Sequence, residues 1–563
     1  MLSENQFGPW NPGIESHVPQ ELRHLATIFR AENVFTSIAT ATELRGLTGF
    51  CLGELVVFRP RRLALHELLV RVTADFAVPD GTRIADLGLN FREIARLLLS
   101  DYLEPAMGAI VEAYQRAQRD AQGCVEPALS RLTRNWGPEE ITAIERQAAE
   151  SADAAGAAAY KSLARVLSGL FTTQGAAWGT KDLIASMATG LASNDLGSER
   201  IGQTIAPLLQ TAAREQGYKL LPRQEHPVVI NTKGPSASGK STLRPLQKKL
   251  AGDIGVQWSD FALISPDIWR KQLLDYGSLG AAFKYAGAFT SDEVQIIDQK
   301  LDRYMAAKNR RGDMSHLLID RFRFDSFAPD SGEAGSNLLT RFGQTVYLFF
   351  VITPPAMLVE RAWKRGLEFG RYKAVDDTLA HSVEAYSGIP DVFFTWVRRS
   401  DKRIQFEFLD NTVRLGERPR TVAFGDNETF NVLDVKAILD IQRYARIDVD
   451  ASAADLLFPD RALLVPSKNV DFLKRCVKGF HWVNFAEQAS GRIYLRIERG
   501  QPILKDRAAF EAAILSPDTL AAIRAVAPDA LTGNVSEAPQ AAYLAAKDGQ
   551  APPLTLGEWG SST

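Results

Sequence analysis

Cysteine is scarce in this sequence. The 563 residues include only Cys51, Cys124 and Cys476, which lie far apart and form no CxxC pair. A disulfide framework and a structural zinc site are therefore not expected. Such sparse cysteine is typical of a reducing compartment, so we expect a cytoplasmic protein. The alternative is an effector that uses a non-cleaved signal and is delivered to a target cell.

An excess of either charge is also absent. Lys and Arg number 65 against 67 for Asp and Glu, which gives a formal net charge of -2. No global field would draw this chain onto nucleic acid or anionic lipid. We therefore expect no membrane partner and no nucleic-acid partner. Binding of nucleic acid in a local basic cleft stays open as an alternative.

Long hydrophobic runs are missing as well. The most apolar run covers residues 346–359, is too short to span a bilayer, and contains Pro354 and Pro355. The first residues show no basic segment followed by an apolar one, so we expect no signal peptide. With 45% hydrophobic and 23% charged residues, the composition is that of a soluble globular protein.

The length predicts three or four domains. Residues 1–220 are predicted to be mostly helical, with helical periodicity at 21–30, 91–103 and 106–121 and high helix propensity across 139–171. Their role is unknown. From 221 to 420, β-rich runs alternate with helical patterns, which predicts an α/β domain whose parallel sheet has helices on both faces. Its strands are expected at 228–231, 261–265, 317–322, 346–352 and 404–409.

The rest of the chain is predicted to form a small α+β region over residues 421–536. Strands are expected there at 445–449 and 492–497, and helices at 431–444 and 507–515. Residues 537–563 are rich in Ala, Gly, Pro and Ser, a composition typical of a flexible tail.

The motif with the clearest chemistry follows the first predicted strand. Residues Gly234-Pro235-Ser236-Ala237-Ser238-Gly239-Lys240-Ser241 match GxxxxGK[ST], and a helix is predicted over 242–251. We call Gly234–Thr242 the glycine-rich loop. Glycines let successive backbone N–H groups face phosphate oxygens, and the following helix adds its positive end. Lys240 would meet the β- and γ-phosphates and the Ser241 hydroxyl would ligate Mg²⁺.

The whole glycine-rich loop is therefore predicted to bind ATP or GTP with Mg²⁺. The alternative is a turn that is merely rich in Gly and Ser. Nothing in the sequence explains Pro245, which stands inside the predicted helix and removes a backbone donor.

Asp267 and Arg270 follow the second predicted strand. One interpretation is structural: Ser265 caps a helix, Pro266 occupies its first position, and Asp267 complements its dipole. The functional interpretation makes Asp267 the base that accepts a proton from a substrate hydroxyl. Arg270, on the same helical face, would then grip the substrate or the transferring phosphoryl group.

Asp320 ends the third predicted strand, His316-Leu-Leu-Ile-Asp320. An acid at this place commonly reaches Mg²⁺, directly or through water. Arg321 follows it, so the water-activating Glu of an ATPase is missing. A structural cap or ion pair is the alternative for this side chain.

Three arginines follow the fourth predicted strand. Arg361 and Arg365 are four residues apart on one helical face, and Arg371 follows a glycine. A basic helix and loop at this point is what a lid closing over a triphosphate needs. A solvated basic face is the alternative.

In this order, the motifs resemble the zeta-toxin and polynucleotide-kinase branch of the phosphate-loop kinases, over roughly residues 227–413. The resemblance implies a P-loop kinase core. It implies that Lys240 and Ser241 take the phosphate and Mg²⁺ roles and that Asp267 is the general base. Arg270 matches the arginine that follows the catalytic Asp in polynucleotide kinases.

The remaining matches concern the metal and the lid. Asp320 stands where zeta toxins carry Glu and polynucleotide kinases carry Asp. Arg361 or Arg365, together with Arg371, match the lid arginines. Zeta toxins phosphorylate UDP-N-acetylglucosamine, polynucleotide kinases phosphorylate a nucleic-acid 5′-hydroxyl, and an effector of similar fold phosphorylates NAD.

We therefore expect an ATP- and Mg²⁺-dependent phosphotransferase that acts on a hydroxyl of a small nucleotide-containing metabolite, such as a nucleotide sugar or NAD. The resemblance implies a bacterial toxin or effector, whose protein partner would be an antitoxin or chaperone. Two alternatives stay open: a polynucleotide 5′-hydroxyl kinase, and a regulatory protein in which bound ATP switches the helical region.

Overall fold

The computed structural model describes residues 7–83, 85–321, 336–414, 416–537, 542–544 and 554–560. The chain forms two compact units. The sheet unit comprises Met1–His17, Leu221–Ser265 and Met305–Thr563, and the helical unit comprises Val18–Leu220 and Pro266–Tyr304. The change of character predicted near residue 220 thus coincides with a unit boundary, whereas the segment after β2 returns to the helical unit.

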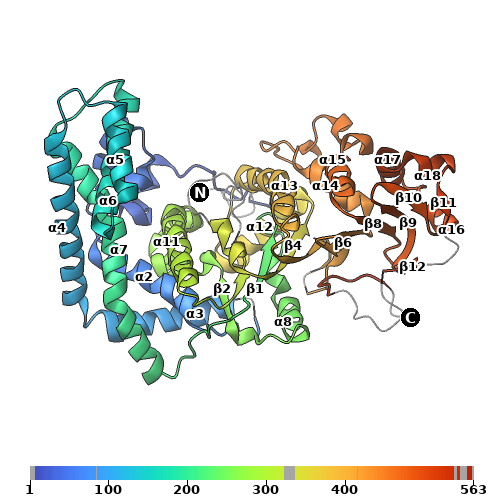
Figure 1. Cartoon of the computed structure of the whole chain (residues 1–563), viewed down its shortest axis with the longest axis horizontal. Helices are drawn as coiled ribbons and strands as arrows, with labels where there is room; N and C mark the ends of the chain where they lie inside the picture. Colours follow the sequence, from blue (N-terminus) through green and yellow to red (C-terminus); the bar gives the residue numbers. More distant parts are fainter. Residues whose placement is uncertain are drawn as a thin grey trace. The chain divides into compact units, whose positions relative to one another are not determined.

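The helical unit is built around helix α2, of whose 16 residues 13 are buried. Helices α4, α6 and α7 pack against one another, as Figure 1 shows. Side-chain caps begin α1, α6 and α7, where Ser37, Asp153 and Thr180 accept backbone N–H groups. Its helices are α1 (Ile38–Thr48), α2 (Pro60–Asp75), α3 (Asp86–Leu97), a π-helix (Leu98–Leu103), α4 (Met107–Arg131), α5 (Pro138–Glu150), α6 (Ala154–Gln174), α7 (Lys181–Glu215), α9 (Arg270–Leu273), α10 (Ala286–Phe289) and the first part of α11 (Ser291–Arg310).

A buried polar network ties α11 to α2. Both oxygens of the Glu293 carboxylate accept from Arg62, and one also lies 2.7 Å from His66 Nε2. Lys300 Nζ donates to His66 Nδ1 at 3.1 Å and to Ser198 Oγ. Burial lowers the pKa of His66 to about 3, so its ring is neutral and must carry its proton on Nε2 to satisfy Glu293. Every charge in this network therefore has a partner.

The sheet unit holds one mixed sheet, in which the described strands follow the order β11-β10-β9-β8-β7-β6-β5-β4-β1-β3-β2, with β12 paired to β9. Strands β2, β3, β1, β4 and β5 are mutually parallel, whereas β6 runs antiparallel to β5. The strands are β1 (Val228–Lys233), β2 (Phe261–Ile264), β3 (His316–Ile319), β4 (Thr345–Ile352), β5 (Arg403–Asp410), β6 (Arg420–Asp426), β7 (Thr429–Val432), β8 (Trp482–Ala486), β9 (Arg492–Glu498), β10 (Gln501–Leu504), β11 (Ser536–Glu537) and β12 (Ala542–Tyr543).

Helices cover both faces of the parallel strands, and Figure 1 shows α8 and α13 on opposite sides of β1 and β4. Because both faces are covered, all eight residues of β4 except the first are buried. The helices of this unit are α8 (Arg244–Asp253), α12 (Pro355–Phe369), α13 (Val375–Val397), α14 (Val435–Tyr444), α15 (Asp471–Gly479), α16 (Arg507–Ala513), α17 (Pro517–Val526) and α18 (Pro528–Thr532).

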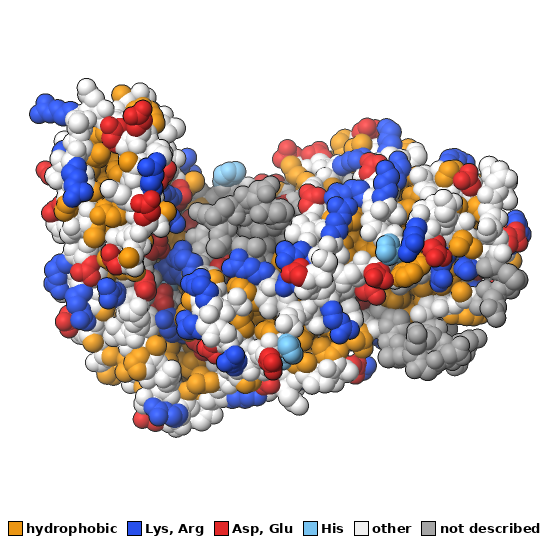
Figure 2. Space-filling view, in the orientation of Figure 1, with side chains coloured by type: hydrophobic (Ala, Val, Ile, Leu, Met, Phe, Trp, Pro, Cys, Tyr) orange, Lys and Arg blue, Asp and Glu red, His pale blue; other side chains and the backbone are white. Residues whose placement is uncertain are grey.

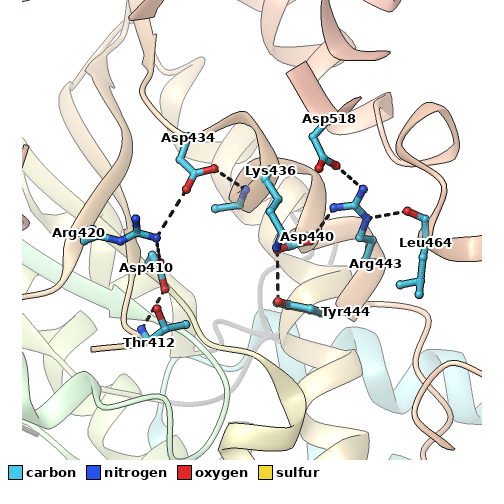
Figure 3. Close-up of polar contacts among 11 residues, drawn as sticks. Asp410, Thr412, Arg420, Asp434, Lys436, Asp440, Arg443, Tyr444, Leu464 and Asp518 are labelled. Atoms are coloured by element: carbon cyan, nitrogen blue, oxygen red, sulfur yellow. Dashed lines mark hydrogen bonds and ion pairs between the residues drawn. The ribbon is translucent and has the colours of Figure 1, made fainter. Parts of the chain in front are cut away.

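An ion network fixes α14 to its surroundings (Figure 3). Arg443, which is buried, donates to Asp440 at 2.8 Å, to Asp518 of α17, and to the Leu464 carbonyl at 3.2 Å. Lys436 supplies a second cation to Asp440 at 2.6 Å. The two buried charges are thus compensated, which is the condition for tolerating them inside a fold.

Several predicted elements differ in the structure. Residues 445–449 form no strand: Ala445 ends α14, and Ile447 and Val449 pack irregularly in a cluster with Val359 and Leu379. Their alternating apolar pattern reflects that packing rather than a ladder. The helix predicted at 21–30 is instead two 3₁₀ turns, Gln20–Leu25 and Thr27–Phe29, interrupted by the extended Ala26.

Two further boundaries differ for capping reasons. The helical stretch predicted over 139–171 is divided into α5 and α6, because Asp153 starts a new helix by accepting the Gly156 N–H. The helix predicted from residue 431 begins at Val435, where Asp434 is the N-cap, and Asn431 and Val432 belong to β7. Phe322, the last residue of the predicted third strand, lies outside the described residues.

The described residues 554–560 pack against the sheet. The backbone N–H groups of Leu556 and Gly557 donate to the buried Glu407 carboxylate of β5 at 2.6 and 2.9 Å. Trp559 stacks on Phe424 of β6, with 5.0 Å between the ring centroids. This part of the segment predicted as a flexible tail therefore has fixed hydrogen-bond and ring partners.

Two surface properties bear on partners. Among the described residues, no helix combines the length and apolar character needed to cross a bilayer. On the face shown in Figure 2, basic and acidic side chains are interspersed over each unit.

Candidate functional site

The glycine-rich loop joins β1 to α8. Lys240–Leu243 form a 3₁₀ turn, and the α-helix begins at Arg244 rather than at the predicted Thr242. This later start explains Pro245, because it falls in the first turn of α8, where its missing N–H has no helical partner to lose. Gly239 has φ 93°, ψ 21°, a left-handed conformation that favours glycine. Ala237 is also left-handed, with φ 65°.

The loop lies at a special point of the sheet. Strand β1 sits between β3 and β4, in the order β2-β3-β1-β4-β5. The chain leaves β1 toward the β3 side and crosses to the β4 side only after β3, so the strand order reverses at β1. In open parallel sheets, ligands bind at the carboxyl ends of the strands at such a reversal. The carboxyl end of β1 is where the glycine-rich loop begins.

The two predicted metal ligands lie together although 79 residues separate them. The Ser241 hydroxyl donates to Asp320 Oδ2 at 2.9 Å. Asp320 is positioned by the sheet, because its backbone N–H donates to the Ile264 carbonyl at the end of β2. Both side chains are partly exposed. The structure thus places a hydroxyl and a carboxylate side by side at the carboxyl edge of the parallel strands.

Lys240 reaches back over its own loop. Its ammonium donates to the carbonyls of Gly234 and Pro235, at 3.0 Å each. The side chain is partly exposed, so its charge lies at the loop rather than in the core. These two hydrogen bonds hold the ammonium group over the first two residues of the loop.

A third feature of the loop was not foreseen from the sequence. The Ser238 carbonyl accepts hydrogen bonds from Asn411 Nδ2 at 2.6 Å, from Thr353 Oγ1 at 3.4 Å and from Arg361 at 3.4 Å. Thr353 follows β4 and Asn411 follows β5, so both parallel strands contribute a donor. No local pattern signals these residues, because their role depends on strands that only the folded sheet brings beside β1.

The carboxyl end of β5 is itself held by ion pairs and a turn (Figure 3). Asp410 Oδ1 accepts the Thr412 N–H at 2.9 Å, and its other oxygen accepts from Arg420 of β6. Arg420 also lies 3.7 Å from Asp434. This arrangement fixes the direction in which the chain leaves β5, and therefore the place of Asn411.

The predicted lid arginines have different surroundings. Arg361 and Arg365 lie four residues apart on α12 as predicted, and Gly370 ends that helix in a left-handed conformation. Arg361 donates to the carbonyls of Asn411 and Val413 at 2.8 and 3.1 Å. Burial lowers the pKa of Arg361, and the nearby Asp410 opposes that shift. Arg361 thus links the glycine-rich loop to the segment that follows β5 by hydrogen bonds to backbone carbonyls of both.

Arg371 lies in the short link between α12 and α13. The neighbouring Lys373 fixes this link to α13 through contacts with His381 and with Asp377, the latter at 3.6 Å. The predicted basic helix is α12, and the predicted basic loop is the link between α12 and α13. That they close over a triphosphate stays a prediction.

Asp267 and Arg270 belong to the helical unit, on the turn Pro266–Trp269 and helix α9. Arg270 Nε donates to Asp267 Oδ1 at 2.8 Å, so the predicted shared face is present. Arg270 also donates to the Gly287 carbonyl at 2.7 Å and to Thr290 Oγ1 at 2.8 Å. About half of the Asp267 side chain is exposed, against 18% of Arg270. Arg270 therefore anchors this turn, and the role of Asp267 as a base stays a prediction.

The donor set at the loop is suited to Mg²⁺. Within the described part of the chain, no three His, Cys, Asp or Glu side chains gather to hold a metal by themselves. Mg²⁺ seldom needs such a cage, because it is usually bound by one or two carboxylates together with phosphates and water. The Ser241 hydroxyl and Asp320 carboxylate match that requirement.

Comparison with known proteins leaves the family open: no family model, no curated protein and no solved structure matches this chain.

Proposed function

We propose that the protein is an ATP- and Mg²⁺-dependent phosphotransferase with a P-loop kinase core formed by β1–β5, α8, α12 and α13. The observation that carries this proposal is the pairing of Ser241 with Asp320 at the carboxyl edge of the sheet, directly after the GxxxxGK sequence. A chance Gly/Ser-rich turn would not require its serine hydroxyl to meet a carboxylate from a neighbouring parallel strand.

The residues of the glycine-rich loop would bind the triphosphate. Backbone N–H groups of the loop would contact phosphate oxygens, and Lys240 would exchange its carbonyl partners for the β- and γ-phosphates. Ser241 and Asp320 would hold Mg²⁺, which neutralises charge on the phosphates when bound.

The transfer itself needs an acceptor hydroxyl and a base. The bond between the γ-phosphorus and the β–γ bridging oxygen breaks, and a bond from the acceptor oxygen to that phosphorus forms. The hydroxyl proton passes to a carboxylate, for which Asp267 is our candidate from the sequence. The hydrogen bond from Arg270 Nε would fix the orientation of that carboxylate.

The acceptor class comes from the resemblance noted in the sequence. We propose a small nucleotide-containing metabolite such as a nucleotide sugar or NAD, and a bacterial toxin or effector as the biological role. The approximate balance of charges, 65 basic against 67 acidic residues, favours a small acceptor over a polynucleotide.

The test is transfer of radiolabel from γ-labelled ATP, with Mg²⁺, to a bacterial metabolite extract, to nucleotide sugars, to NAD and to an oligonucleotide with a free 5′-hydroxyl. We expect a labelled small metabolite with wild type and none with Lys240→Ala. Lys249→Ala, which removes an exposed lysine of α8, is the matched control and should behave as wild type. Label on the oligonucleotide alone would indicate a polynucleotide kinase. Tight ATP binding without transfer to any acceptor would indicate a regulatory protein.

A further inference from the structure

We propose that Asn411 is a positioning residue that fixes the orientation of the Ser238–Gly239 peptide in the glycine-rich loop. The inference rests on the proposed nucleotide binding of this loop. It adds a residue from the end of β5, 170 positions away from the motif, whose amide nitrogen lies 2.6 Å from the Ser238 carbonyl oxygen.

The geometry of the peptide unit carries the argument. A trans peptide is planar, so its carbonyl and its N–H point in opposite directions. The Ser238 carbonyl is held on one side by Asn411, with Thr353 and Arg361 as longer partners. The N–H of Gly239 must therefore point to the opposite side, away from those three donors. Rotation of this peptide would reverse the direction of that N–H and break all three hydrogen bonds.

Asn411 is itself held at both ends. Its backbone N–H donates to the Ile352 carbonyl at 2.9 Å, which extends the β4–β5 pairing by one residue. Its backbone carbonyl accepts from Arg361 at 2.8 Å. Asn411 is only 6% exposed, so water does not compete for its side-chain amide. A rigid donor of this kind can impose an orientation on a loop.

The second donor is supported in the same way. Thr353 has its backbone N–H and carbonyl bound by the hydroxyl of Tyr386, at 2.8 and 2.6 Å. Tyr386 is buried on α13, and burial raises the pKa of its hydroxyl well above the ordinary value, so it stays protonated and able to donate. The orientation of the Ser238–Gly239 peptide is thus fixed by residues that follow β4 and β5 and by Tyr386 of α13.

Close packing explains why residue 239 is glycine. A Cβ added there would lie 2.3 Å from Asn411 Nδ2, much closer than any real contact. The asparagine occupies the space that a side chain at 239 would need. The same approach that lets Asn411 reach the Ser238 carbonyl therefore requires a glycine beside it.

The experiment compares binding of ADP and of adenosine, which lacks phosphates, by wild type and Asn411→Ala. Losing one hydrogen bond of this kind should weaken ADP binding about threefold to tenfold. Adenosine affinity should not change, because the loop orientation concerns phosphate alone. A merely structural defect would weaken both ligands together, so the ratio of the two dissociation constants is the diagnostic quantity.

Two further variants complete the test. Thr353→Val removes the longer 3.4 Å donor and should reduce ADP affinity in the same direction but less. It carries the test if Asn411→Ala does not fold. Asn469→Ala is the matched control: this buried asparagine also donates to backbone carbonyls, those of Leu463 and Val465, in the same unit. Its ADP affinity should equal that of wild type.

The possible failures are distinguishable. Unchanged ADP affinity in both Asn411→Ala and Thr353→Val would overturn the role of Asn411 and leave nucleotide binding intact. Absence of ADP and ATP binding by wild type would overturn the proposed function, and the inference with it.

Discussion

Replacing the buried Glu407 by glutamine should flatten part of the pH dependence of stability. Glu407 is 1% exposed on β5, and it accepts from Thr421 Oγ1 and from the backbone N–H groups of Leu556 and Gly557. Burial raises the pKa of Glu407 from 4.5 to about 7, and these hydrogen bonds only partly oppose the shift. The folded protein therefore keeps this proton up to about pH 7, whereas the unfolded chain releases it near pH 4.5.

The sign and size follow from proton linkage. Between the two pKa values the folded state binds more protons, so the free energy of unfolding decreases as pH rises. From pH 5 to pH 8, the two pKa values give a loss of roughly 2 to 3 kcal/mol from this one group. Glutamine does not titrate, so the variant lacks this contribution.

Urea unfolding of wild type and Glu407→Gln at several pH values provides the assay. The difference between their free energies of unfolding isolates Glu407, because the other titrating groups are common to both proteins. That difference should shift by roughly 2 to 3 kcal/mol in favour of the variant between pH 5 and pH 8. Glu511→Gln, at an exposed position of α16, should give a profile parallel to wild type. A parallel profile for Glu407→Gln would refute the reasoning.

Two further predictions concern a buried ion pair and the loop glycine. Glu293→Gln should lower the free energy of unfolding by about 3 to 5 kcal/mol, because it leaves the buried Arg62 cation uncompensated. Glu112→Gln, which removes one partner of an exposed ion pair, is the control. In the same urea titration it should change the free energy of unfolding by less than about 0.5 kcal/mol. A small effect of Glu293→Gln would mean that the pair is not buried as described. Gly239→Ala should abolish measurable ADP binding in calorimetry, because the new methyl group would displace Asn411, whereas Gly252→Ala on α8 has open space and should bind normally. Normal binding by Gly239→Ala would contradict the packing of the loop.

The parallel strands could be predicted because burial on both faces leaves a continuous apolar run. Thr345–Ile352 is such a run, and its predicted bounds differ by one residue. The strand predicted at residues 445–449 is absent, because the alternating apolar residues of an irregular segment also pack against helices. Helix starts were displaced where a capping Asp or a 3₁₀ turn decided the boundary, as at Asp434 and at Lys240–Leu243.

The candidate site could be predicted only in part. Asp320 directly follows β3, and Lys240 and Ser241 lie in the loop after β1, so sequence position alone assigns them to one edge of the sheet. Asn411 also follows a strand, but its role is to hold a carbonyl from another segment, and no spacing rule identifies such a partner. Arg361 was predicted from its charge as a lid residue, whereas the structure shows it bound to carbonyls at the loop and at the end of β5.

Calorimetric titration of MgATP into wild type, Lys240→Ala and Lys249→Ala tests the central claim most directly. The account predicts one site per chain in wild type and in Lys249→Ala with equal dissociation constants, and binding at least about tenfold weaker in Lys240→Ala, since a charge-assisted contact to phosphate is lost. Absence of binding in wild type, or equal affinity of all three proteins, would contradict it.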